Sequence, residues 1–137
     1  MMVRITVGLV ALSLAIASLG CSKKPDECNA LIDVVNKGIA TNSANPMDDA
    51  EGIKKAAETY SAQAADLSKV QLTLPELKKI SGDLQKSSGE VSSAAHSLAA
   101  AQEKEQAETA VAGVKKSVDG YKKSVDELKT FCGVESK

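Results

Sequence analysis

The apolar residues of this chain recur at intervals of three and four, the spacing of one helix face, and no sustained period-two alternation is present. The pattern is clearest near the C-terminus, where successive spacings of 3, 4, 3, 4, 3 and 4 form a heptad seam. The seam consists of Val111, Val114, Val118, Tyr121, Val125, Leu128 and Cys132. Gly133 follows directly, in the place where a glycine commonly ends a helix. The sequence therefore predicts a long last helix that buries this seam.

Three further helices are predicted upstream. Thr73 and Glu76 have the spacing of a capping box and predict a helix start. Asn45 followed by Pro46 predicts the cap and first position of the preceding helix. We expect the first helix to begin at Pro25 and to fray over residues 41–44. The predicted core face of the first helix is Cys28, Leu31, Ile32, Val35 and Ile39. That of the second is Ile53, Ala57, Tyr60, Ala64 and Leu67. That of the third is Leu77, Ile80, Leu84, Ser87, Val91, Ala94, Leu98 and Ala101.

Residues 1–20 have the pattern of a secretory signal peptide. Arg4 supplies an early positive charge, and residues 5–19 form a mostly apolar run that ends in small residues. A transmembrane helix is the rival interpretation, but it needs about twenty apolar residues. This run stops at Gly20 and enters a polar stretch at residues 22–25, which favours the signal peptide.

The end of this leader resembles the lipobox of bacterial lipoproteins. Gly20 and Cys21 match that motif, whereas Ser18 stands where the family most often has Leu, and Leu19 where it usually has a small residue. The resemblance implies a lipid on Cys21, a short tether at residues 21–24 and a place in the cell envelope. Ser22 resembles the outer-membrane class, facing either the periplasm or the cell surface. Ordinary signal-peptide cleavage before Cys21 is the alternative, because Ser18 and Gly20 are small.

The cysteine count supports this division of roles. If Cys21 carries lipid, Cys28 and Cys132 remain as an even pair in an oxidising compartment. A metal site at Cys21 and Cys28 is not expected, because zinc needs four ligands and the only histidine, His96, lies far along the chain. We therefore expect a disulfide between Cys28 and Cys132, and no metal.

This disulfide constrains the topology. Without a break, residues 75–131 would form one helix of about 85 Å at 1.5 Å per residue. Bridged cysteines need Cα atoms within about 7 Å, so the chain must turn, and the polar run at residues 102–106 is the place. An even number of helices then brings both ends together. The predicted fold is all-α: an antiparallel up-down-up-down four-helix bundle at residues 25–133, closed by one disulfide and followed by a tail at residues 134–137.

Composition and motifs exclude several function classes. After the leader the chain carries 16 lysines against 18 acidic residues, which argues against nucleic-acid binding. There is no G-x-S-x-G, H-E-x-x-H, C-x-x-C-H or P-loop motif, and His96 has no second histidine or catalytic cysteine to act with. We expect neither an enzyme nor a bound cofactor, and His96 should lie at the surface or its boundary.

The expected function is therefore that of a lipid-anchored envelope protein with a structural or protein-interaction role. Its partners would be the membrane, through the N-terminal lipid, and another envelope protein. The alternative is a periplasmic or surface module that binds a ligand, a cation or a folding client.

Two charged groups are candidates for binding. One is an acidic tip opposite the bridged ends, which has Lys104 as its single base. Its acids are Asp48, Asp49, Glu51, Glu103, Glu105 and Glu108. A simpler role for them is to stabilise helix dipoles in first turns. The other group is a lysine stripe beside the last seam, either a solvated face or a contact for anionic polymer. It comprises Lys115, Lys116, Lys122, Lys123 and Lys129.

Overall fold

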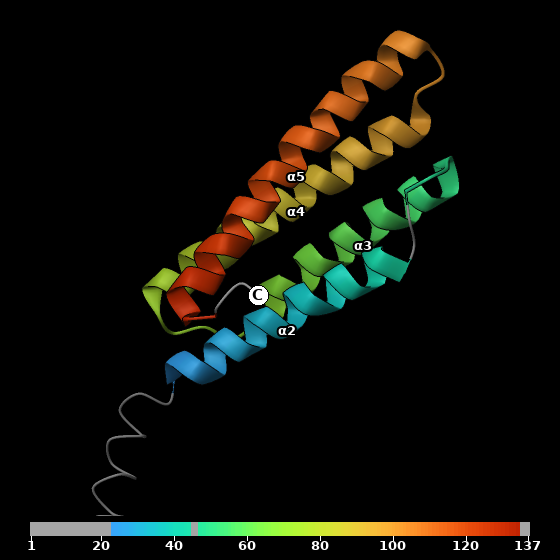
Figure 1. The fold of residues 1–137 in the computed structure, drawn as a ribbon. Coiled ribbons are helices and arrows are strands. Elements are labelled where there is room, and N and C mark those ends of the chain that lie inside the picture. Colours follow the sequence, from blue (N-terminus) through green and yellow to red (C-terminus); the bar gives the residue numbers. More distant parts are fainter. Residues whose placement is uncertain (1–22, 45–46, 135–137) are drawn as a thin grey trace, which may run out of the picture.

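Four α-helices that pack against one another make up the described chain, and this part of the molecule contains no strand (Figure 1). The computed structural model describes residues 23–44 and 47–134. The helices are α2 (Lys23–Ala44), α3 (Ala50–Lys69), α4 (Pro75–Ala100) and α5 (Lys104–Cys132). The predicted all-α class is confirmed. None of these helices is long and apolar enough to cross a membrane.

In Figure 1, α2 and α4 start at the lower left, while α3 and α5 start at the upper right. The break predicted near residues 102–106 lies at residues 101–103. We call the end that holds the start of α2 and the finish of α5 the bridge end, and the opposite end the far end.

A disulfide joins the two termini of the helical domain, as predicted. The Sγ atoms of Cys28 and Cys132 are 2.03 Å apart, the Cα atoms are 5.8 Å apart, and the two residues are separated by 104 positions in sequence. A bridge that closes a loop of about 100 residues contributes about 4.7 kcal/mol in the chain-entropy model. Apart from this bond, α2 contacts mainly α3 and touches α4 and α5 little. The disulfide therefore holds the first helix onto the other three.

The start of α3 differs from the prediction. The helix begins at Ala50, and its cap is Asp49, whose carboxylate accepts a hydrogen bond from the Gly52 N–H at 2.7 Å. The predicted cap and first position, at residues 45 and 46, lie outside the described residues. The first N–H groups of a helix lack partners within the helix, and a side chain that accepts a hydrogen bond from one of them two or three residues later favours a helix start. Asp49 supplies that acceptor for α3.

The first helix is longer than expected at both ends. It starts at Lys23, because proline is tolerated in the first turn and Pro25 does not interrupt it. It also continues to Ala44 rather than fraying over residues 41–44. The hydroxyls of Thr41 and Ser43 each donate to a carbonyl one turn earlier at 2.9 Å, which accommodates these polar side chains within the helix.

The predicted seam of the last helix is buried only in its second half. Tyr121, Val125 and Leu128 are buried, but no residue of α5 before Tyr121 is. Val111 is 44% exposed. The reason is a difference in helix length: measured from the bridge, α2 extends about 24 Å and α5 about 42 Å, at 1.5 Å per residue. The first helix therefore ends before it can cover the start of α5.

Other predicted core positions are distributed between full and partial burial. Ser87 is buried, as expected, while Ile39 is 42% exposed. The buried members of the predicted faces are Cys28, Leu31, Val35, Ala57, Leu67, Leu77, Ile80, Leu84 and Val91. Those that are half-buried are Ile32, Ile53, Tyr60, Ala64, Ala94, Leu98 and Ala101.

A glutamine occupies the centre of the core, which the apolar pattern does not predict. Gln63 of α3 is 4% exposed, and its amide nitrogen donates to the carbonyls of Val34 and Val35 at 3.4 and 3.3 Å. Its amide oxygen accepts from the Ser88 hydroxyl at 3.3 Å. The side chain fits because Gly38 of α2 has no Cβ in its path. One residue thus links α2, α3 and α4.

Two glycine-to-alanine substitutions should move the stability in opposite directions. Gly82→Ala adds a Cβ with no atom within 4 Å, and the better helix propensity should raise the free energy of unfolding by about 0.5–1 kcal/mol. In Gly38→Ala the new Cβ lies against the Gln63 amide. The free energy of unfolding should fall by about 1–3 kcal/mol, because the buried hydrogen bonds of Gln63 are lost. Urea titrations followed by circular dichroism measure both. Equal stabilisation by the two alanines would show that Gln63 does not lock α2 in place.

Candidate functional site

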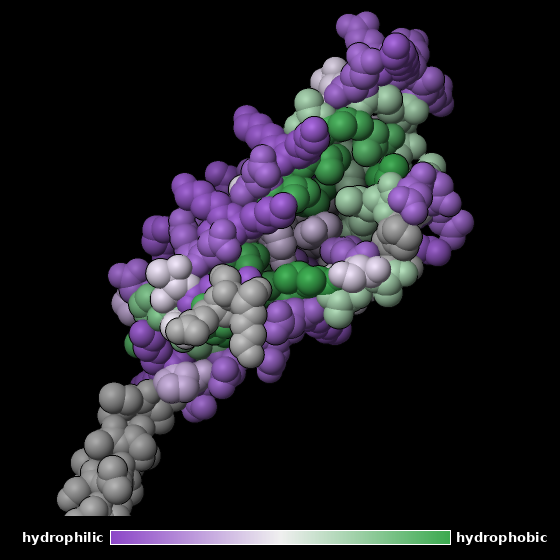
Figure 2. Space-filling view, viewed as in Figure 1, coloured by the Kyte–Doolittle hydropathy of each residue, from purple (hydrophilic) through white to green (hydrophobic). Residues whose placement is uncertain are grey.

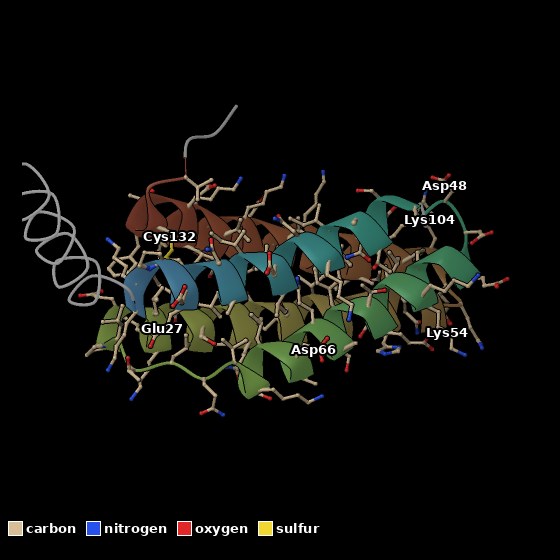
Figure 3. The ribbon with its side chains drawn as sticks, turned by 90° about the horizontal axis from the view of Figure 1, so that it is seen from below. Glu27, Asp48, Lys54, Asp66, Lys104 and Cys132 are labelled. Carbon is tan, nitrogen blue, oxygen red and sulfur yellow. A yellow bond between two sulfur atoms is a disulfide. The ribbon has the colours of Figure 1, made fainter. Side chains whose placement is uncertain are left out.

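A buried carboxylate ties the first helix to the connection between α3 and α4. Glu27 is 8% exposed and accepts from the Thr73 N–H at 2.7 Å, the Thr73 hydroxyl at 2.5 Å and the Leu74 N–H at 3.1 Å. Figure 3 shows Glu27 at the same end of the molecule as Cys132. The bridge end is thus held by a covalent bond and by a charge-assisted hydrogen-bond cluster.

The capping box predicted at Thr73 is therefore wrong. Helix α4 begins at Pro75, and its cap residue, Leu74, makes no side-chain hydrogen bond. Proline at the first helical position has no N–H to satisfy. The Thr73 hydroxyl donates to Glu27, so it serves the contact between α2 and this connection. Nothing in the local sequence distinguishes Glu27 from an ordinary first-turn acid.

These hydrogen bonds lower the pKa of Glu27 below its ordinary value of 4.5. The bond from the Thr73 hydroxyl is the largest cause, and the N–H groups of Leu74 and Thr73 and the charge of Lys23 act in the same direction. Burial acts in the opposite direction and is outweighed. Nearby, the Lys24 ammonium lies 4.4 Å from the centre of the Phe131 ring, a second contact between α2 and α5.

A groove of about 650 Å³ runs between α4 and α5 near the bridge end. Ile80 and Phe131 contribute its apolar lining. Its charged lining contains four acids and three bases, so the groove does not select a ligand by the sign of its charge. These residues are Glu76, Lys79, Asp119, Lys122, Lys123, Asp126 and Glu127.

The predicted acidic residues lie at the starts of α3 and α5, at the far end. Several already have intramolecular roles: Asp49 caps α3, Glu51 pairs with Lys55 at 2.9 Å, and Glu108 pairs with Lys104 at 3.8 Å. In Figure 3, Asp48, Lys54 and Lys104 share this end. Lys54 and Lys55, in the second turn of α3, and Lys104, at the start of α5, therefore offset part of the acidic charge.

Metal ligation has no support in the described part of the chain. Residues 23–44 and 47–134 contain no cluster of three His, Cys, Asp or Glu side chains that could hold an ion. His96 is exposed, as predicted, on α4. In the predicted lysine stripe Lys129 is half-buried, and Lys115, Lys116, Lys122 and Lys123 are exposed. The predicted lipidation site, Cys21, lies outside the described residues.

The rings of two tyrosines pack against each other inside the bundle. The sequence places each of them on a core face but does not predict this contact. The rings of Tyr60 and Tyr121 pack edge to face with centroids 5.4 Å apart. Burial raises the pKa of Tyr121 to about 12, and the nearby Gln63 side chain acts in the opposite direction. The contact adds packing where most neighbouring side chains are small.

No family model, no curated protein and no solved structure matches this chain. Its function is therefore argued from its own residues: the bridge end, the acids of the far end and the exposed face of α5.

Glu27→Gln should destabilise the protein near neutral pH, because the amide weakens a charge-assisted cluster. Since the folded-state pKa of Glu27 is lowered, its contribution is present above pH 4.5 and is lost as the pH falls through the folded-state pKa. The difference in unfolding free energy between wild type and Glu27→Gln should thus shrink on acidification. Urea titrations at a series of pH values test this. A difference that stays constant down to pH 2 would contradict the assigned role.

Proposed function

We propose that this chain is a lipid-anchored protein of the cell envelope with a structural or protein-interaction role and no catalytic activity. In this proposal residues 1–20 are a cleaved signal peptide and Cys21 carries the lipid. The four helices then form an antiparallel up-down-up-down bundle that stands on the membrane, most simply the outer membrane.

The disulfide between Cys28 and Cys132 carries the proposal. Structural disulfides persist in oxidising compartments, so the bridge supports export. The chain has three cysteines, and the bridge leaves Cys21 as the one available for a lipid. Its position, directly after an apolar leader, agrees with that role.

The short distance between Cys21 and the first helix supports an orientation. Helix α2 begins at Lys23, so the connection spans at most about 7 Å at the extended limit of 3.3–3.6 Å per residue. A lipid on Cys21 would bring the bridge end against the membrane. The far end and the exposed start of α5 would then point away from the anchor, where a protein partner can reach them.

Metabolic labelling with a fatty-acid probe tests the anchor. The wild-type chain should be labelled and should sediment with membranes, because two or more acyl chains give stable attachment where one is marginal. Cys21→Ala should lose both the label and the membrane fraction while it keeps the Cys28–Cys132 bridge. Equal labelling of the two proteins would show that the fatty acid is attached elsewhere and would disprove lipidation at Cys21.

The alternative function, a binding module for a ligand, cation or folding client, is favoured by the gathering of acids at the far end. If these acids bind calcium, added calcium should raise the melting temperature of the wild-type protein, since a ligand of the native state stabilises it. The four substitutions Asp48→Asn, Glu51→Gln, Glu103→Gln and Glu105→Gln should abolish that rise. Asp49 is kept because it caps α3.

A matched control variant distinguishes the loss of a calcium site from the change in the net charge of the protein. Asp26→Asn, Asp33→Asn, Glu58→Gln and Glu90→Gln remove the same four charges from exposed positions elsewhere on the helices. This control should respond to calcium as the wild type does. If the wild type itself shows no response, the acids act only in capping and helix-dipole stabilisation.

A further inference from the structure

The first half of α5 presents an apolar face that the other helices of the described chain cover only in part. We call Ala107, Val111, Val114 and Val118 the open face. Val111 is 44% exposed, Ala107 and Val114 are half-buried, and Val118, also half-buried, packs against the core at the inner end of this face. They continue the same seam whose second half, from Tyr121 onward, is buried in the core. The pattern of a buried helix therefore extends beyond the residues that the bundle buries.

Helix lengths explain the open face and show where it lies. The pair α4 and α5, of 26 and 29 residues, is longer than the pair α2 and α3, of 22 and 20 residues. In Figure 1 α5 moves away from α2 toward the far end, while α3 stays beside α4. In Figure 2 apolar surface gathers over the end of α4 and the start of α5, beside a hollow between the pairs.

The charges that border the open face identify the kind of helix that fits. In the heptad register Val111 and Val118 occupy position a, and Ala107 and Val114 occupy position d. Glu108 and Lys115 then occupy position e, on the edge of the open face that points to solvent, and both are exposed. The opposite edge, position g, holds the uncharged residues Ala110 and Ser117. One edge thus carries an acid and a base exactly one heptad apart.

We propose that the open face binds the same face of a second copy of this chain, with the two α5 helices antiparallel. In antiparallel packing an a position faces a d position, so Val111 faces Val114 of the second copy and Val118 faces Ala107. The same alignment sets Glu108 beside Lys115 of the second copy. Two-fold symmetry repeats each contact, giving two opposite-charge pairs that frame a valine-rich centre.

Other occupants match this face less well. Two parallel α5 helices would place the charged e positions beside the uncharged g positions, so Glu108 and Lys115 would gain no partner. A lipid chain would use the valines but not the alternating charges at their edge. Three turns of helix give an interface at the small end of the range, below about 1,200 Å², and hence a reversible contact. This pairing depends on α5 alone and holds whether or not Cys21 is acylated.

Photo-cross-linking in intact cells tests the pairing with the full chain. A photoreactive amino acid replaces Val111, which is exposed and whose replacement leaves the core intact. Two differently tagged copies are co-expressed and irradiated, and we expect a covalent species that contains both tags. The same amino acid at Lys116, which is exposed and lies on another side of α5, should give none. Cross-linking of Val111 to lipid or to a different protein, with no species carrying both tags, would overturn the proposal.

Charge reversal tests the alignment. Glu108→Lys alone and Lys115→Glu alone each turn both opposite-charge pairs into like-charge pairs, and each should reduce the cross-linked dimer about tenfold at low expression. Co-expression of one tagged Glu108→Lys chain with one tagged Lys115→Glu chain restores both pairs. The mixed dimer should therefore return to the wild-type yield.

Matched reversals on the same helix control for net charge. Glu105→Lys and Lys116→Glu make the same charge changes at exposed positions away from the open face, and both should pair like the wild type. Helicity and an intact Cys28–Cys132 bridge, checked for every variant, confirm folding. Failure of the mixed dimer to recover, or equal loss in the control variants, would overturn the alignment.

Discussion

The disulfide between Cys28 and Cys132 is the constraint on which the shape of this molecule depends. It fixes the first turns of α2 to the last turn of α5, across 104 positions of sequence. The first helix has few other means of attachment, because the tight packing lies between α3 and α4 and between α4 and α5. Glu27 adds a second fixed point one residue away, on the connection between α3 and α4. Both contacts act at the same end, so α2 is held most firmly at its start, and farther along the hydrogen bonds from Gln63 to the Val34 and Val35 carbonyls hold it in place.

This uneven attachment explains why the two ends of the bundle differ. At the bridge end Leu31, Leu77 and Leu128 are essentially inaccessible to solvent. Toward the far end the core becomes smaller and more polar, through alanines, serines and Gln63. Small side chains allow α3 and α4 to approach closely, but they leave less apolar area to bind a fourth helix. Beyond the end of α2 the start of α5 remains exposed.

Local patterns in the sequence predict the helices and their order, and the cysteine count predicts the bridge. These predictions succeed because each depends on neighbouring residues or on a covalent rule. The partner of Thr73 could not be predicted, because Glu27 lies 46 positions earlier and looks like any first-turn acid. Gln63 is similar: its burial depends on the missing Cβ of Gly38, on another helix. The heptad seam of α5 was assigned to the core as a whole, since periodicity shows which face is apolar but not how much of it the other helices can reach.

The start of α2 and the finish of α5 both lie at the bridge end, which has a geometric consequence for an antiparallel pair. The alignment of Val111 with Val114 centres the two-fold axis near residue 112, so each bridge lies about 30 Å from the axis at 1.5 Å per residue. The two tethers of such a pair therefore leave it at opposite poles, about 60 Å apart. If Cys21 carries the proposed lipid, the two lipids of such a pair lie at opposite poles, so a pair held in one membrane would lie flat along the bilayer, whereas a single copy would stand on it.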